Sequence, residues 1–182
     1  MIEVRFHGRG GQGAVTSAEL VALAAISEGK YAQSFPSFGP ERRGAPVQSF
    51  TRVSDQPIRL RTAIRQPDYS VVLDPSLILV GGALSGLKQN GMVVINTRKS
   101  IAEIKKEFSI TARTAVVDAT RIALDTLGLP ITNTTMIGAL VKASRIVNME
   151  SLLEPLRHRF GRIADKNSKV CQLAYEATVI EE

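Results

Sequence analysis

Apolar and polar residues alternate at the start of the chain, and the pattern then changes to a helical period. Residues 2–7 alternate as a β-strand does, and the glycine-rich run 8–13 interrupts them. Apolar residues then recur at helical spacing from Ala14 to Ala25, and Gly29 ends the predicted helix. The chain therefore opens as a strand, a glycine loop and a helix.

Strands and helices continue to alternate along the chain. Further strands are predicted at residues 31–35, 47–53, 69–73, 92–96 and 115–118, with a hairpin turn at 55–57 that leads to 58–60. Helices are predicted at 75–87, 119–127, 134–148, 151–160 and 166–179. This order predicts an α/β fold: a doubly wound, Rossmann-like, mostly parallel sheet with flanking helices and a helical C-terminal part.

Length and composition fit one ordinary globular domain spanning residues 1–182. The apolar fraction is 44% and the charged fraction is 22%. No apolar run reaches the roughly 18 residues that would span a bilayer. The first residues enter a strand pattern directly, without the basic and apolar regions of a signal peptide. These features predict a cytoplasmic protein that does not contact a membrane.

Cysteine and histidine are scarce. Cys171 is the single cysteine, so the chain forms no internal disulfide. An iron–sulfur cluster normally needs about four thiolates, and one is available. His7 and His158 do not stand in a cluster with the spacing of metal ligands. The sequence therefore predicts no metal site and no catalytic nucleophile in this chain, and any metals of a redox system would belong to another chain.

The glycine loop comprises Gly8, Arg9, Gly10, Gly11, Gln12 and Gly13, a G-x-G-x-x-G pattern between a strand and a helix. Glycines there allow positive φ and close approach, while N–H groups at a helix start attract phosphate. A tight turn with close helix–strand packing would need the same glycines. A dinucleotide site would also need an acid at the end of the second strand, and residues 31–35 contain none.

The turn-rich loop at residues 36–46 contains Arg42 and Arg43. In a doubly wound sheet the ends of the first two strands face one crevice, so these arginines are predicted to lie near the glycine loop. Guanidinium groups bind phosphates well, and Arg9 would add a third donor set. The alternative is a solvated turn in which Glu41 pairs with a neighbouring arginine.

Four segments together resemble one known family. They are Phe6–Val15 (FHGRGGQGAV), Tyr31–Gln33 (YAQ), Phe38–Pro46 (FGPERRGAP) and Asn133–Ala143 (NTTMIGALVKA). In this order they are similar to the gamma subunits of pyruvate and related 2-oxoacid:ferredoxin oxidoreductases. The resemblance covers almost the whole chain.

The resemblance implies a subunit of a hetero-oligomer with alpha, beta and delta type subunits. Such a complex oxidatively decarboxylates a 2-oxoacid to acyl-coenzyme A and passes electrons to ferredoxin. Thiamine diphosphate, magnesium and iron–sulfur clusters are then expected on partner subunits. This chain would bind part of coenzyme A through the 8–13 loop with Arg42 and Arg43. Alone it would be inactive, and an apolar patch that normally meets partners would allow a homodimer.

Two other functions remain open at this point. The first is a stand-alone NAD(P)- or flavin-binding oxidoreductase domain, which the glycine loop suggests. The second is a basic nucleic-acid-binding module, which the net charge of +6 suggests. Aromatic residues make up 5% of the chain, so few platforms are available for stacking bases. The sequence therefore favours a protein that binds no nucleic acid.

Overall fold

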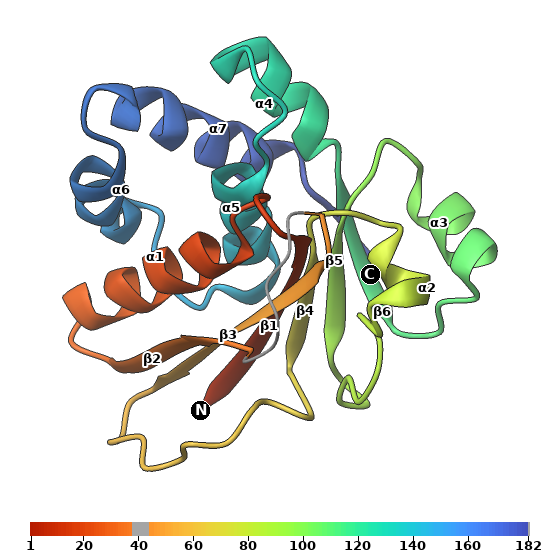
Figure 1. Cartoon of the computed structure of the whole chain (residues 1–182), viewed down its shortest axis with the longest axis horizontal. Coiled ribbons are helices and arrows are strands. Elements are labelled where there is room, and N and C mark those ends of the chain that lie inside the picture. Colours follow the sequence, from red (N-terminus) through yellow and green to blue (C-terminus); the bar gives the residue numbers. More distant parts are fainter. Residues whose placement is uncertain (38–43, 182) are drawn as a thin grey trace.

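A computed structural model describes residues 1–37 and 44–181 of the chain (Figure 1). Its centre is a seven-stranded sheet with the order β2-β3-β1-β4-β5-β6-β7. The strands are β1 (Ile2–Arg9), β2 (Tyr31–Pro36), β3 (Pro46–Ser54), β4 (Tyr69–Val72), β5 (Met92–Asn96), β6 (Arg113–Val117) and β7 (Val179–Ile180).

Strands β1, β4, β5 and β6 run parallel and form the middle of the sheet. Strand β3 pairs antiparallel with β1, β2 pairs antiparallel with β3, and β7 pairs antiparallel with β6. All of β5 is buried, and the sequence of the strand is a continuous apolar run up to Asn96, as expected for a strand covered on both faces. The predicted doubly wound α/β fold is therefore confirmed, with antiparallel strands at both sides of the sheet.

Helices cover the sheet in two groups (Figure 1). They are α1 (Ala14–Ser27), α2 (Leu77–Val80), α3 (Ile101–Phe108), α4 (Ala119–Leu127), α5 (Asn133–Ser144), α6 (Leu153–Phe160) and α7 (Ala164–Ala177), with short 3-10 turns at Glu150–Leu152 and Gly161–Ile163. Helices α1 and α5 pack on one face, and α6 and α7 pack outside them. Helices α2 and α3 lie on the opposite side (Figure 1).

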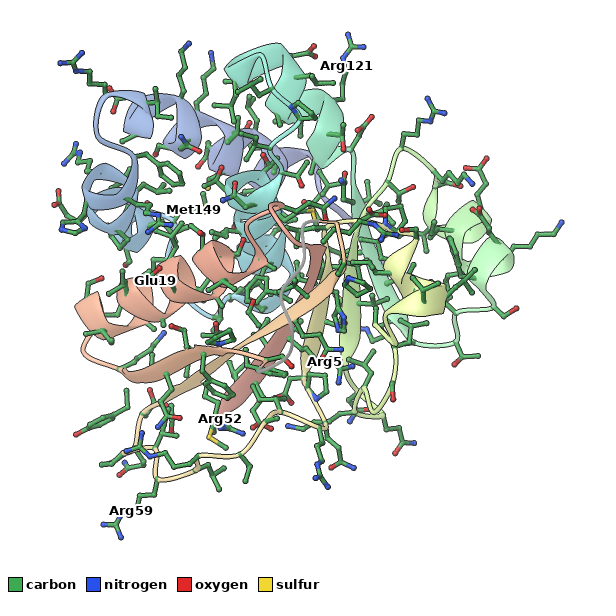
Figure 2. The ribbon with its side chains drawn as sticks, viewed as in Figure 1. Arg5, Glu19, Arg52, Arg59, Arg121 and Met149 are labelled. Atoms are coloured by element: carbon green, nitrogen blue, oxygen red, sulfur yellow. The ribbon has the colours of Figure 1, made fainter. Side chains whose placement is uncertain are left out.

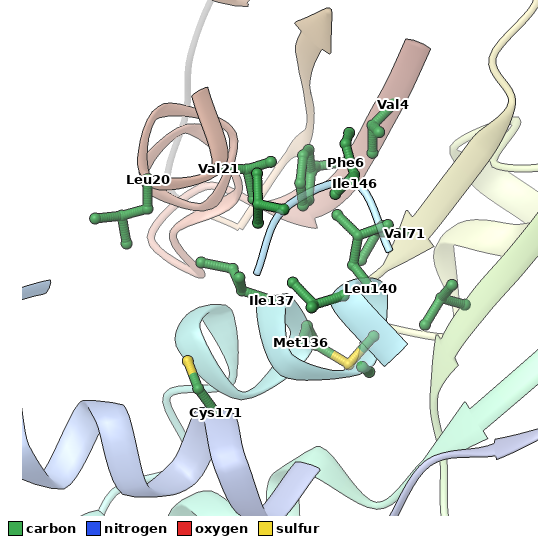
Figure 3. Close-up of a cluster of buried hydrophobic side chains, with 14 of the residues drawn as sticks. Val4, Phe6, Leu20, Val21, Val71, Met136, Ile137, Leu140, Ile146 and Cys171 are labelled. Carbon is green, nitrogen blue, oxygen red and sulfur yellow. The ribbon is translucent and has the colours of Figure 1, made fainter. Parts of the chain in front are cut away.

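The core has a larger and a smaller part, one on each face of the sheet. In the larger part, Phe6 of β1 and Val21 of α1 meet Ile137 and Leu140 of α5 (Figure 3). The smaller part joins buried residues of β4, β5 and β6 to Ile104 of α3. Burial of apolar surface at about 25 cal/mol per Å² makes these contacts the main source of stability. They hold the loops at the strand ends in place.

Several predicted elements differ in extent from the structure. The helix predicted at 75–87 is wrong beyond its first turns: α2 ends at Val80, where Gly81 and Gly82 begin a series of turns. The helix predicted at 134–148 ends at Ser144, because Arg145 adopts a left-handed conformation. Residues 58–60 form no strand, and the predicted hairpin turn before them is only a bend at residues 55–56.

Two elements were missed by the sequence analysis. Helix α3 begins at a capping box in which Ser100 and Glu103 each accept from the other's backbone N–H. That S-x-x-E pattern was the available signal. Strand β7 has only two residues, too few for a periodic pattern. None of the described helices is long and apolar enough to cross a membrane.

Candidate functional site

The carboxyl ends of the parallel strands meet at one edge of the sheet. The glycine loop follows β1 there, Asp74 follows β4, residues 97–99 follow β5, and Asp118 follows β6. Ligands of open α/β sheets bind at this edge, where loops leave the strands on either side of a crevice. The glycine loop that the sequence singled out therefore lies at this edge.

The glycines of the loop serve two purposes. Gly11 and Gly13 have φ values of 95° and 83°, which side-chain-bearing residues rarely adopt. A Cβ at Gly13 would lie 2.7 Å from Nδ2 of Asn133, so this glycine lets α1 pack closely on the start of α5. Among residues 1–37 and 44–181, a Cβ at Gly11 would meet nothing within 4 Å. Gly13 is therefore required for close packing of the helices, whereas Gly11 has no close neighbour in the described part of the chain.

The start of α1 is suited to an anion. Gly13 is its N-cap residue and provides no capping side chain, and the first turn contains no acid. The backbone N–H groups at Ala14 and the following residues carry the partial positive charge of the helix dipole. A phosphate at this position would accept hydrogen bonds from those N–H groups.

Arg9 connects the glycine loop to the end of β4. Its Nε donates to Oδ2 of Asp74 at 2.9 Å, its Nη2 to Oγ of Ser76 at 2.7 Å, and its Nη1 to the carbonyl of Gly44 at 3.0 Å. Gln12 adds a second connection, because its Oε1 accepts from the Arg9 N–H at 2.7 Å and its Nε2 donates to Asp74 at 3.4 Å. In this structure the Arg9 guanidinium therefore braces the loop.

Asp74 is the acceptor at the centre of this brace, and the sequence analysis did not identify it. Burial raises the pKa of its carboxyl, but hydrogen bonds from Ser76, Arg9 and Gln12 outweigh burial and lower the pKa overall. The carboxylate is thus ionised and holds Arg9 in a fixed direction. The position of Asp74 directly after an apolar strand was the signal that could have revealed it.

Arg42 and Arg43 lie outside the described residues. The chain that follows them is described, and it lies directly against the glycine loop. The Gly10 N–H donates to the carbonyl of Ala45 at 2.8 Å, and the Gly44 N–H donates to the carbonyl of Gly10 at 3.2 Å. The end of the 36–46 loop and the glycine loop are therefore joined by backbone hydrogen bonds.

A pocket of about 480 Å³ continues the same edge beyond Asp74. It lies at the ends of β5 and β6, and basic side chains line it together with Asp118. The basic residues are Arg98, Lys99 and Arg121. Arg98 and Lys99 come two and three residues after the end of strand β5, and this position was the signal that could have revealed them. Lys99 pairs with Glu107 and Arg121 pairs with Asp125, so these two cations are already partly neutralised.

A dinucleotide site would need a free acidic side chain beside the glycine loop to bind the ribose, and the described residues do not provide one. On one side of β1 the neighbouring strand is the antiparallel β3, so no parallel strand ends beside the loop there. On the other side the acid after β4 is Asp74, whose carboxylate already accepts from Arg9 and Ser76. The residues of β2 include no acid. These features speak against an NAD-type site.

His7 is buried beneath the edge and does not face it. Only 1% of its surface is exposed, and its Nε2 accepts from Nε of Arg5 at 2.9 Å. Burial, and secondly the charge of Arg5, lower the pKa of His7 to about 3. Arg5, which Figure 2 labels, donates in turn to the carbonyl of Ala83. His7 is therefore a neutral structural acceptor.

Comparison with known proteins gives a consistent result over the whole chain. The family model "Pyruvate ferredoxin/flavodoxin oxidoreductase" matches residues 3–177. The chain is 54% identical to "Pyruvate/ketoisovalerate oxidoreductases common subunit gamma" of Thermococcus litoralis, with 100% of both chains covered. It is 50% identical to "Pyruvate synthase subunit PorC" of Methanothermobacter marburgensis, with 97% of each covered.

Solved structures agree. The pyruvate oxidoreductase subunit PORC of Thermotoga maritima superposes with a TM-score of 0.89 at 35% identity, covering 100% of this chain and 98% of that one. A 2-oxoglutarate:ferredoxin oxidoreductase chain of Magnetococcus marinus shares the fold, with a TM-score of 0.77 at 17% identity, and the match spans 30% of that chain. The resemblance seen in the sequence is confirmed: the chain belongs to the pyruvate ferredoxin/flavodoxin oxidoreductase family and is of the gamma, or PorC, subunit type.

Proposed function

We propose that this gamma-type chain works in a pyruvate-type 2-oxoacid:ferredoxin oxidoreductase complex and contributes part of its coenzyme A site. The complex would oxidatively decarboxylate the 2-oxoacid, form acyl-coenzyme A and reduce ferredoxin. The observation that carries the proposal is the placement of the glycine loop at the carboxyl edge of the sheet, against the end of the 36–46 loop. The site would comprise Gly8, Arg9, Gly10, Gly11, Gln12, Gly13, Arg42 and Arg43.

The chemistry of the edge fits coenzyme A. This ligand carries a pyrophosphate and a 3′-phosphate, and the uncapped start of α1 offers N–H groups for one phosphate. No described residue lies within 4 Å of the position that a Cβ of Gly11 would occupy, so a ligand could approach the backbone closely there. Arg42 and Arg43 would supply guanidinium groups for a second phosphate. The Magnetococcus marinus enzyme with the same fold was solved with 2-oxoglutarate, coenzyme A and succinyl-CoA bound.

The other cofactors are assigned to partner subunits. Thiamine diphosphate, magnesium and iron–sulfur clusters would be held by chains of the alpha, beta and delta types. An iron–sulfur cluster needs about four thiolates, and this chain has one cysteine. Cys171 is buried, and its Sγ lies 2.9 Å from the carbonyl of Thr134. On this assignment the chain contributes binding and assembly, while the chemistry takes place on its partners.

Helix α2 is the best candidate for an assembly contact near this edge. Leu79 is 74% exposed and Val80 is 68% exposed, although both are large apolar residues. They follow Asp74 and Ser76 closely in the chain, so a partner that covers them would also approach the glycine loop. Isolated chains would pair through such a surface, and the homodimer remains a prediction that light scattering tests.

The experiment that tests the coenzyme A site uses the complex reconstituted from all its subunits. The double variant Arg42→Ala/Arg43→Ala should raise the KM for coenzyme A about tenfold or more, because each charge-assisted contact contributes about 1.5–3 kcal/mol. The KM for pyruvate should change little. The matched control Arg157→Ala/Arg162→Ala removes two exposed charges from another surface and should leave both constants unchanged.

Two outcomes would contradict the proposal. If the double variant assembles with an unchanged KM for coenzyme A, the two arginines form a solvated turn or a subunit contact. If the purified chain alone reduces a viologen with a 2-oxoacid and coenzyme A, the assignment of thiamine and clusters to partners is wrong. Dephospho-coenzyme A, which lacks the 3′-phosphate, refines the assignment. If its KM equals that of coenzyme A in the double variant but not in the wild type, the two arginines bind the 3′-phosphate.

A further inference from the structure

In the β2–β3 half of the sheet, one face is not covered by any helix of the described part of the chain. Helix α1 packs on β2 and β3 from one side. On the other side, the connection between β3 and β4 passes the sheet as an irregular chain, at the bottom of Figure 1. We call residues 55–66 of this connection the basic strap. Connections longer than about 12 residues without secondary structure are uncommon in compact domains and are usually functional.

The basic strap is attached to the sheet at defined points. Ile64 is buried, and the carbonyl of Ile58 accepts from Nε2 of Gln33 at 3.1 Å. Near the end of the strap, the carbonyl of Arg65 packs against Gly86, which lies outside the strap and has positive φ. A Cβ at Gly86 would clash with that oxygen. The strap is therefore a preformed surface, and a partner would not have to order it on binding.

The outward side chains of the strap are basic. Arg59, Arg61 and Arg65 are exposed, and Asp55 is the single acid in the segment. Leu60, 47% exposed, stands between two of the arginines. Arginine beside an exposed apolar side chain is typical of protein interfaces, where it combines charge pairing with apolar contact.

A pocket of about 750 Å³ beside the strap is lined by Arg52, whose guanidinium is incompletely paired, and by the single acid Glu3, which already pairs with Arg52. Arg52 is 1% exposed; its Nε pairs with Oε1 of Glu3 at 2.8 Å, and its Nη2 donates to the carbonyl of Thr62 at 2.7 Å. Its Nη1 is buried and finds no acceptor among the described residues. A buried donor without an acceptor is costly. The lining residues Arg65 and Gln66 add further donors around this space.

We propose that the basic strap and the Arg52 pocket form a docking surface for an acidic segment of another subunit of the same complex. Carboxylates of that segment would pair with Arg59 and Arg61, and one acceptor oxygen would enter the pocket on the side of Arg52. The inference rests on one part of the proposed function, namely that the chain works within a multi-subunit complex, and it does not depend on the coenzyme A site. It adds a contact surface away from the carboxyl edge that holds the glycine loop.

Two other occupants fit the surface less well. A second copy of this chain would place one basic strap opposite another in a twofold contact, and the like charges would repel. Single-stranded nucleic acid would find the arginines but no aromatic side chain on which to stack, since residues 55–66 contain none. An acidic protein segment satisfies both the arginines and Leu60.

The first test measures how strongly the chain stays in the purified complex as sodium chloride is raised. At a given salt concentration, Arg59→Glu/Arg61→Glu should raise the dissociation constant of this chain from the complex about tenfold, because two favourable charge pairs become repulsive. The matched control Arg157→Glu/Arg162→Glu makes the same change in net charge on and just after α6, and should retain the wild-type salt profile. Equal behaviour of the two double variants would overturn the proposal.

The second test identifies the occupant. Arg59→Lys/Arg61→Lys keeps the charge and introduces amines, which a carbodiimide couples to carboxylates within contact distance. New cross-links from positions 59 and 61 should lead to aspartates or glutamates of one segment in another subunit. Cross-links to a second copy of this chain, release of the chain by nuclease, or no new cross-link would each overturn the assignment.

The coenzyme A proposal is judged separately. At low salt, where the complex of the Glu variants is intact, their KM for coenzyme A should equal that of the wild type. A complex that holds this chain through the strap but has no coenzyme A-dependent activity would refute the proposed function and leave the docking surface standing. Normal coenzyme A kinetics together with unaltered salt retention would refute only the docking surface.

Discussion

Gly138 of α5 packs directly on the backbone carbonyl of Cys171 in α7: a Cβ at Gly138 would come well within 3.0 Å of that oxygen. The atoms of Cys171 in this contact belong to the backbone, so a change of side-chain rotamer cannot relieve a clash there. The two helices form the most extensive helix–helix contact in the described part of the chain. Their closeness depends on this one glycine.

Gly138→Ala should therefore destabilise the protein, because the added methyl group forces α5 and α7 apart. We expect a loss of about 1–3 kcal/mol in the free energy of unfolding, with a fall in Tm of roughly 2–4 °C per kcal/mol. Thermal and urea unfolding measure it. Gln172→Ala, on the exposed face of α7, serves as control and should stay within about 0.5 kcal/mol. Equal stability of the Gly138 variant and wild type would contradict the close packing.

Cys171 should be chemically inert in the folded protein. Burial raises the pKa of its thiol to about 12, so the reactive thiolate is scarce at neutral pH. A thiol reagent such as DTNB should label the native chain very slowly between pH 7 and about 9. The same reagent should react at once after unfolding in urea. Rapid labelling of the native protein would show that α5 and α7 separate readily.

His7 should make stability depend on pH. Its pKa is lowered from 6.5 to about 3, by burial and then by Arg5, so the unfolded chain binds a proton between these values while the folded chain does not. Stability from this group is complete above pH 6.5 and is lost as pH falls toward 3, by up to about 1.4 kcal/mol per pH unit.

The measurement compares urea unfolding of wild type and His7→Gln across that range. Glutamine retains an acceptor for Arg5 but does not titrate, so the variant should show a shallower decline in acid. NMR gives an independent reading: the His7 imidazole signals should stay constant between about pH 5 and 8. A His7 titration near 6.5 would contradict the burial of this side chain.

The sequence predicted the elements with strong periodic patterns. The strand at β5 is a continuous apolar run and α1 has a regular apolar spacing, so both were placed within a few residues. Helix α3 was missed although Ile101, Ile104 and Phe108 recur at helical spacing and contact the smaller part of the core, because a helix of only eight residues shows that spacing over little more than two turns. Helix α2 was overextended because Gly81 and Gly82 end it inside an apolar stretch.

The candidate site was predicted in part for a similar reason. The glycine loop is a local motif and was found directly, but its partners come from distant positions in the chain. Asp74 meets Arg9 only because β4 pairs with β1, and this pairing is a property of the folded sheet. The same holds for Arg52 and Glu3, which are opposite each other in β3 and β1. Long-range pairing of this kind leaves no trace in local periodicity.

Asp74→Asn tests whether the brace on Arg9 matters for the proposed coenzyme A site. The amide keeps the shape of the side chain but removes the charge that pairs with Nε of Arg9 at 2.9 Å. The glycine loop should then be less well ordered, and the KM for coenzyme A in the reconstituted complex should rise about three- to tenfold. The KM for pyruvate and the assembly of the complex should not change. The control Glu154→Gln removes an exposed partner of Arg157 on α6 and should have no effect of this size. If Asp74→Asn leaves the KM for coenzyme A unchanged, the brace serves folding alone.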